Sequence, residues 1–141
     1  MSSQHLSVRV DAATLDRLDQ ESRRLGESRS QVAKRFLEEG LRMSAHPGIV
    51  FRPGPAGRRP GLAAGPDVWE VISLFQEFEA PREDAIRRTA EWSSLTPQQV
   101  RVALSYYAEF PDEIDNWIQR NDEEAHIAKA RWRREQALLG S

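Results

Sequence analysis

The residues best suited to specific recognition lie at the start of the chain, where polar and apolar side chains alternate. In residues 5–10 the polar side chains are His5, Ser7 and Arg9, and the residues between them are apolar. An extended chain places successive side chains on opposite faces, so the three polar groups share one face. Arginine suits the O6 and N7 acceptors of guanine in the major groove of DNA. This face is therefore a candidate for reading base edges.

The opposite face of the same segment is apolar and needs a cover. It carries Leu6, Val8 and Val10, the period-two pattern of a half-buried strand. A single strand cannot satisfy its edge hydrogen bonds or bury its apolar face alone. The simplest partner is the same strand of a second copy. We therefore expect an obligate homodimer whose two-stranded ribbon displays the polar face twice.

Other kinds of chemistry have little support in the sequence. The three histidines are scattered, at positions 5, 46 and 126, and the chain has no cysteine. It also lacks a phosphate-cradling glycine loop and a nucleophile elbow. We expect no enzyme activity, no metal and no cofactor. No apolar run approaches the roughly 18 residues of a membrane span, so we expect a cytoplasmic protein without membrane contact.

Two short helices are expected to follow the ribbon. Asp11 can cap a helix that starts at residue 12 and carries leucines at 15, 18 and 25 on one side. Gly26 can end that helix in the left-handed conformation. Ser28, followed three residues later by Gln31, matches the capping box. The second helix is then expected over residues 29–43.

The whole pattern is more specific than the ribbon alone. The pieces are Leu6-Ser7-Val8-Arg9-Val10, Leu15 and Leu18, the run from Leu25 to Val32, and Phe36-Leu37. They resemble the ribbon-helix-helix repressors of the Arc, MetJ and CopG kind. The resemblance implies a dimer that inserts its ribbon into the major groove of operator DNA. It implies base-reading roles for His5, Ser7 and Arg9, and a phosphate clamp made by the backbone amides around Ser28, Arg29 and Ser30.

Formal charges divide unevenly along the chain. The net charge is +1 over residues 1–45, +3 over 46–66, −9 over 67–124 and +3 over 125–141. Acidic surface repels phosphate, so DNA contact is expected on the N-terminal side.

Residues 46–66 hold 5 of the 8 prolines and 5 of the 8 glycines. A structureless linker is one interpretation. Strand-like runs at 49–51 and 61–63 instead favour a small β-hairpin with a loop from Pro53 to Pro60. Arg58 and Arg59 would then lie at the loop tip, either as solubilising residues or as additional DNA contacts.

The sequence of residues 67–120 predicts a helical domain. Helices are expected after Asp67, from about Pro81, over residues 97–109, and after Pro111. The pair over 82–109 has helix-turn-helix dimensions. Its outward residues, which a second DNA reader would use, are Gln98, Gln99, Arg101 and Ser105. The acidic charge of the segment favours a structural or dimerising role instead.

Several pieces of this half also form a recognisable pattern. They are Pro47-Gly48-Ile49-Val50-Phe51, Gly57-Arg58-Arg59, the run from Gly65 to Val71, the run from Leu95 to Arg101, and Tyr106-Tyr107. They resemble a small helix-turn-helix-like domain of antitoxins encoded beside PIN-type or PIN-like ribonuclease toxins. The resemblance implies a protein toxin as partner.

Residues 112–139 are expected to form one long helix whose final part, 121–141, is basic. A frayed tail is one interpretation of that part. The alternative is a docking segment for the acidic site of the toxin, because Trp and Arg are frequent interface anchors. The candidate toxin-binding residues are Lys129, Arg131, Trp132, Arg133, Arg134 and Leu138.

Together these observations predict a mainly helical protein: a ribbon-helix-helix domain over 1–45, a linker with a hairpin over 46–66, a helix-turn-helix-like domain over 67–120 and a basic C-terminal helix over 121–141. The expected function is a type II antitoxin that binds operator DNA as a dimer, autorepresses, and neutralises a PIN-type or PIN-like ribonuclease toxin through its C-terminal region. One alternative is a stand-alone repressor with a sensory second domain. Another is an interaction adaptor whose ribbon only dimerises.

Overall fold

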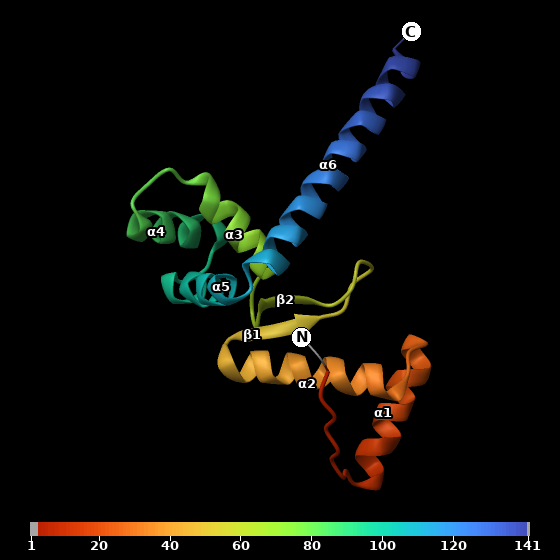
Figure 1. Ribbon diagram of the computed structural model, residues 1–141. Helices are drawn as coiled ribbons and strands as arrows, with labels where there is room; N and C mark the ends of the chain where they lie inside the picture. The colour runs from red at the N-terminus through yellow and green to blue at the C-terminus, as the bar shows by residue number, and fades with distance from the viewer. Residues whose placement is uncertain (1–2, 141) are drawn as a thin grey trace. The chain divides into compact units, whose positions relative to one another are not determined.

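The computed structural model describes residues 3–140, which divide into two compact units, one ending at Ser44 and the other starting at Ala45. Within the described residues there are six helices and one two-stranded sheet (Figure 1). In chain order they are α1 (Ala12–Leu25), α2 (Arg29–Ala45), β1 (Ile49–Arg52), β2 (Arg59–Leu62), α3 (Val68–Glu77), α4 (Arg82–Ser93), α5 (Pro97–Glu109) and α6 (Pro111–Leu139). The predicted class, mainly α with a small hairpin, is confirmed.

The first unit has its helix ends where the sequence predicts them. Asp11 caps α1, its Oδ1 accepting the Thr14 N–H at 2.8 Å. Gly26 ends α1 with φ of 66°, a left-handed conformation that glycine adopts without a steric cost. Ser28 and Gln31 exchange the two bonds of the capping box, at 2.9 and 3.1 Å. The second helix runs two residues further than expected, to Ala45.

The N-terminal segment forms no strand within the single chain. Residues 3–10 have no regular secondary structure in the part of the chain that the structure describes. The expected strand partner belongs to a second copy, so a single chain cannot test the pairing. The ribbon therefore stays a prediction, and so does the complete ribbon-helix-helix architecture.

The second unit begins with the predicted hairpin. β1 and β2 pair antiparallel, with Ile49 opposite Leu62 and Arg52 opposite Arg59. The expectation that Arg59 lies at the loop tip is wrong, because Arg59 is the first residue of β2. The hairpin is more than a linker, since Ile49 and Leu62 are buried in the same core as the helices that follow.

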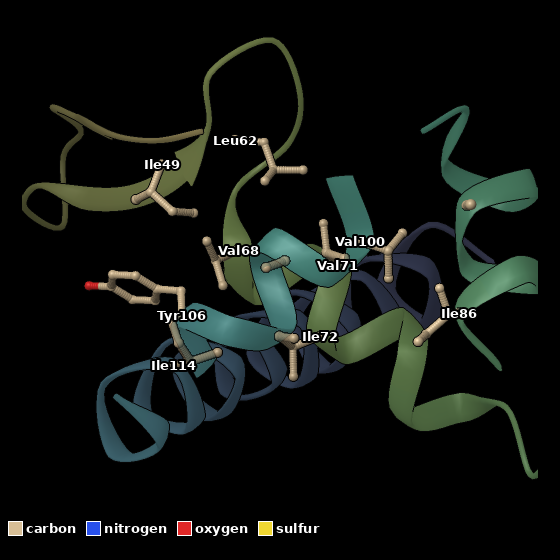
Figure 2. Packing of buried hydrophobic residues seen from close by; sticks show 11 residues of the cluster. Ile49, Leu62, Val68, Val71, Ile72, Ile86, Val100, Tyr106 and Ile114 are labelled. Atoms are coloured by element: carbon tan, nitrogen blue, oxygen red, sulfur yellow. The ribbon is translucent and has the colours of Figure 1, made fainter. Parts of the chain in front are cut away.

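That core lies where α3, α4, α5 and the start of α6 meet the hairpin. Figure 2 shows its buried side chains, which converge from all of these elements. α3 contributes Val68, Val71 and Ile72, all at most 1% exposed. α6 contributes Ile114, which is fully buried, near its first turn. The core therefore holds the beginning of α6 and leaves the rest of that helix outside it.

The helix pair α4–α5 has the predicted boundaries. Ser94 ends α4 in the left-handed conformation, with φ of 56°. Thr96 then starts α5 with a complete capping box to Gln99 and Pro97 at the first helical position. Whether the pair acts as a helix-turn-helix stays a prediction. Among the described residues, no helix combines the length and the apolar character needed to cross a bilayer.

Candidate nucleic-acid interface and partner-docking helix

The predicted base-reading residues lie on an exposed, extended segment. His5, Ser7 and Arg9 are all exposed. The His5 Nε2 and Ser7 Oγ atoms are 2.9 Å apart, which places these two side chains on the same side of the backbone. This is the arrangement that period-two alternation requires.

The apolar side of that segment is exposed in the part of the chain that the structure describes. Leu6 is 66% exposed, Val8 72% and Val10 50%. α2 adds further exposed apolar side chains, which are Phe36, Leu37, Leu41 and Met43. In residues 3–44, Val32 is the one buried hydrophobic residue, and none of the residues of α1 is buried. The first unit therefore lacks a closed hydrophobic core of its own.

The start of α2 offers a smaller anion site than the sequence predicts. The Ser28 N–H already donates to the Gln31 side chain at 2.9 Å, so it is engaged within the capping box. The amides of Arg29 and Ser30 have no acceptor among the described residues, as expected in the first turn of a helix. The Arg29 guanidinium itself pairs with Asp19 at 2.7 and 3.0 Å. Any phosphate clamp here would thus rest on the Arg29 and Ser30 amides.

Arg59 and Arg52 are held by one buried carboxylate. Asp67 has an 8% exposed side chain, and its Oδ1 accepts from Arg52 at 3.0 Å while its Oδ2 accepts from Arg59. Arg52 also donates to the carbonyls of Leu62 and, at 2.8 Å, Gly65. Arg59 is therefore part of the fold and is a poor candidate for an additional DNA contact. Arg58 is half-buried in β-hairpin surroundings and also has an interaction partner.

This Arg-Asp-Arg cluster is a feature that the sequence analysis missed. Asp67 occupies the N-cap position of α3, as predicted. Its side chain, however, makes no cap hydrogen bond, so that part of the prediction is wrong. The carboxylate faces the two guanidiniums instead. Two glycines leave room for the guanidiniums. A Cβ on Gly61 would lie 2.2 Å from Arg52 NH1, and one on Gly54 would lie 2.0 Å from Arg59 NH1.

A second missed contact lies where the second unit begins. His46 has a 7% exposed side chain, and its Nε2 lies 2.6 Å from Glu109 Oε2 at the end of α5. Its ring packs edge-on against Tyr106, with centroids 5.3 Å apart. The contact ties the chain just before β1 to the end of α5, which explains why one of the scattered histidines is buried.

The outward face of α5 is a poor candidate for reading DNA. Its cation, Arg101, pairs with Glu83 of α4 at 2.7 and 3.3 Å. The hydrogen bond from Arg101 lowers the pKa of Glu83, so the pair stays ionised at neutral pH. Gln98 and Ser105 lie beside Arg101 in an open pocket of about 390 Å³. An arginine already neutralised by a carboxylate has little charge to offer a phosphate.

A pocket of about 330 Å³ lies between the hairpin loop, α3 and α6. Arg120 lies over the Trp117 ring, 4.9 Å from its centroid, and donates to the Ala56 carbonyl at 3.2 Å. Desolvation raises the pKa of Glu70 on the other side, and the charge of Asp67 adds to this effect. α6 contributes Trp117, Arg120, Asn121 and Glu124 to the lining of this pocket.

Beyond that pocket α6 continues as a helix whose side chains are almost all exposed. Figure 1 shows it projecting away from α3, α4 and α5. From residue 122 to 139 every side chain is exposed except the half-buried Ala130. Trp132 is 58% exposed and Ile127 56%. The predicted toxin-binding residues all lie on this exposed part of α6, and they are Lys129, Arg131, Trp132, Arg133, Arg134 and Leu138.

Comparisons of the chain with family models, with curated proteins and with solved structures find no match. Among the residues that the structure describes, no group of three or more His, Asp or Glu side chains is arranged to hold a metal ion.

Proposed function

We propose that this chain is a dimeric DNA-binding antitoxin. Two copies pair through residues 5–10, bind an operator and repress their own genes, and the exposed part of α6, residues 122–139, holds a PIN-type or PIN-like ribonuclease. The observation that carries the proposal is the uncovered apolar surface of the first unit, which runs along the segment that also displays His5, Ser7 and Arg9.

The energetics favour a second copy as the cover of that surface. Each large apolar side chain moved from water into an interface contributes roughly 1.5–3 kcal/mol. The first unit exposes seven of them: Leu6, Val8, Val10, Phe36, Leu37, Leu41 and Met43. A ribbon formed by two copies also pairs the backbone groups of residues 5–10, which regular structure does not pair within one chain.

Pairing would turn three exposed side chains into a two-fold symmetric reading surface. The ribbon would present His5, Ser7 and Arg9 from both strands, and the major groove admits a two-stranded ribbon. The free amides of Arg29 and Ser30 would lie at a helix N-terminus, which attracts phosphate. The net charge of −9 over residues 67–124 keeps the DNA on the side of the first unit.

The DNA-binding proposal is tested by comparing Arg9→Ala with Arg17→Ala in the full chain. Both remove one exposed arginine of the first unit, so long-range electrostatics change equally. The DNA is the region upstream of the gene of this chain, in fluorescence anisotropy titrations at several salt concentrations. We expect Arg9→Ala to lose about 1–3 kcal/mol of specific binding, and Arg17→Ala to stay close to the parent. Equal affinities for Arg9→Ala and the parent chain would refute the proposal.

The toxin-binding part of the proposal rests on the exposed part of α6. Residues 122–139 place no side chain in the core of the second unit, yet they include exposed Trp132, Ile127 and Leu139. Most of the stability of a helix in a protein comes from packing of its apolar face, and this segment packs none of its side chains into that core. An exposed tryptophan among several arginines is typical of a segment that a protein partner covers.

A further inference from the structure

The Arg29 guanidinium is held by a carboxylate of the preceding helix. Its Nε donates to Asp19 Oδ1 at 2.7 Å, and a terminal nitrogen donates to Asp19 Oδ2 at 3.0 Å. Two parallel bonds of this kind make the strongest geometry of an arginine–carboxylate pair. Asp19 lies on α1, and Arg29 is the first residue of α2. The pair therefore lies beside the amides of Arg29 and Ser30, which the proposed function assigns to DNA phosphate.

The surroundings of Asp19 are basic. Arg23 lies about one turn further along α1. The hydrogen bond from Arg29 lowers the pKa of Asp19, and the charges of Arg29 and Arg23 add to this effect. The carboxylate is therefore ionised at neutral pH. A single negative charge thus lies next to two arginines, and its loss would leave both of them without a neutralising partner at this place.

The pair matters less for the fold than for the charge that the first unit offers to DNA. The side chains are 55% and 31% exposed, for Arg29 and Asp19 respectively, and ion pairs exposed to water contribute little to stability. Affinity for DNA, in contrast, grows with each phosphate that a cation of the protein neutralises. An arginine engaged by a carboxylate through two bonds is not available for such a contact.

We propose that Asp19 limits the affinity of this chain for DNA by holding the Arg29 guanidinium away from the phosphate backbone. The inference rests on the proposed function and adds a control on its DNA contact. Arg29 then offers DNA its backbone amide alone. Neutralising Asp19 releases the guanidinium and adds one phosphate contact for each copy in the dimer.

The test compares Asp19→Asn with Asp16→Asn in the full chain. Both changes remove one carboxylate charge from α1, but Asp16 is exposed and makes no ion pair among the described residues. The probes are the DNA duplex upstream of the gene of this chain and a scrambled duplex of the same length, in fluorescence anisotropy titrations at several salt concentrations.

We expect Asp19→Asn to bind both duplexes roughly fivefold to thirtyfold more tightly, because two copies each gain one exposed ionic contact. Phosphate contacts carry no sequence information, so the gain should be the same for the two duplexes. The slope of log affinity against log salt concentration should steepen by about 0.9 for each added contact. Asp16→Asn should change the affinity less than about twofold and leave the slope unchanged.

Arg29→Gln shows whether the gain comes from Arg29. In the parent chain this change should alter the affinity less than about threefold, and in the Asp19→Asn chain it should remove the gain. The inference is overturned, and DNA binding stands, if Asp19→Asn gains no more than Asp16→Asn or if its gain survives Arg29→Gln. A large loss of affinity for Arg29→Gln in the parent chain also overturns it, because Arg29 would then already contact DNA. If the parent chain binds neither duplex, the DNA-binding proposal fails and the inference fails with it.

Discussion

At the residue scale, the least predictable feature is the use of Asp67. Its position, directly before α3, predicts an N-cap, and that position is correct. Its side chain instead joins two strands, through Arg52 at the end of β1 and Arg59 at the start of β2. Sequence reasoning works from neighbours along the chain, whereas this cluster depends on the hairpin register that places Arg52 opposite Arg59.

Replacing Asp67 by Asn is expected to destabilise the second unit. The amide keeps the size of the side chain but removes the charge that two guanidiniums share, and both guanidiniums are about 30% exposed. We expect the free energy of unfolding to fall by about 2–3 kcal/mol, less than for a fully buried pair. Urea denaturation measures this, with Asp122→Asn on the exposed part of α6 as the matched control.

A result within about 0.5 kcal/mol of the control, the range of ordinary surface substitutions, would mean that the cluster is not a stabilising contact. The same comparison also separates Arg59 as a structural residue from Arg59 as a DNA contact. We expect Asp67→Asn to change stability and to leave the DNA affinity of the folded chain unchanged.

At the element scale, helix boundaries are the part of the fold that the sequence predicts best. The signals are local: Asp11, Gly26 and Ser28 in the first unit, and Thr96 with Pro97 in the second. The hairpin was also predictable, since proline and glycine mark its loop and apolar runs flank it. The side of each element that stays uncovered was not predictable, because it depends on packing between distant residues.

α6 has both a buried part and an exposed part within a single helix. Its first part belongs to the core through Ile114, and its second part leaves the core after the pocket at Trp117. Removal of residues 122–141 is therefore expected to leave the melting temperature and DNA binding of the chain unchanged. The shortened chain should no longer neutralise the toxin in a ribonuclease assay.

The full chain is the control for that assay, together with a thermal melt of both proteins. Toxin neutralisation by the shortened chain would contradict the docking role of the tail. A large fall in melting temperature would show that residues 122–141 stabilise the second unit after all.

At the scale of the whole molecule, the two units differ in how well each buries its apolar side chains. The second unit has a continuous core drawn from its hairpin and helices. The first unit exposes an apolar strip on residues 6–10 and another along α2. Sequence alternation predicted that strip and its need for a partner strand, but a single chain cannot show the pairing. Dimerisation through this strip is the central claim of the account.

Two-fold symmetry restricts which residues of the two copies can lie opposite each other in an antiparallel ribbon formed by residues 5–10. Directly opposite residues share a face, so the symmetry axis must place one residue opposite its own copy, with the two Cα atoms about 4.5–5.5 Å apart. That spacing is within the range that a disulfide bridges. Because the chain has no cysteine, single cysteines can be introduced one at a time without competing thiols.

The most direct test is a scan of single cysteines across residues 5–10 of the full chain, with Ser105→Cys on the exposed face of α5 as control. Each variant is oxidised mildly, and covalent dimer is measured by non-reducing electrophoresis. We expect one position to cross-link fastest and the cross-linking rates of its neighbours to alternate along the strand. Ser105→Cys should form no covalent dimer. If no position within residues 5–10 cross-links faster than Ser105→Cys, the ribbon does not form and the account is wrong.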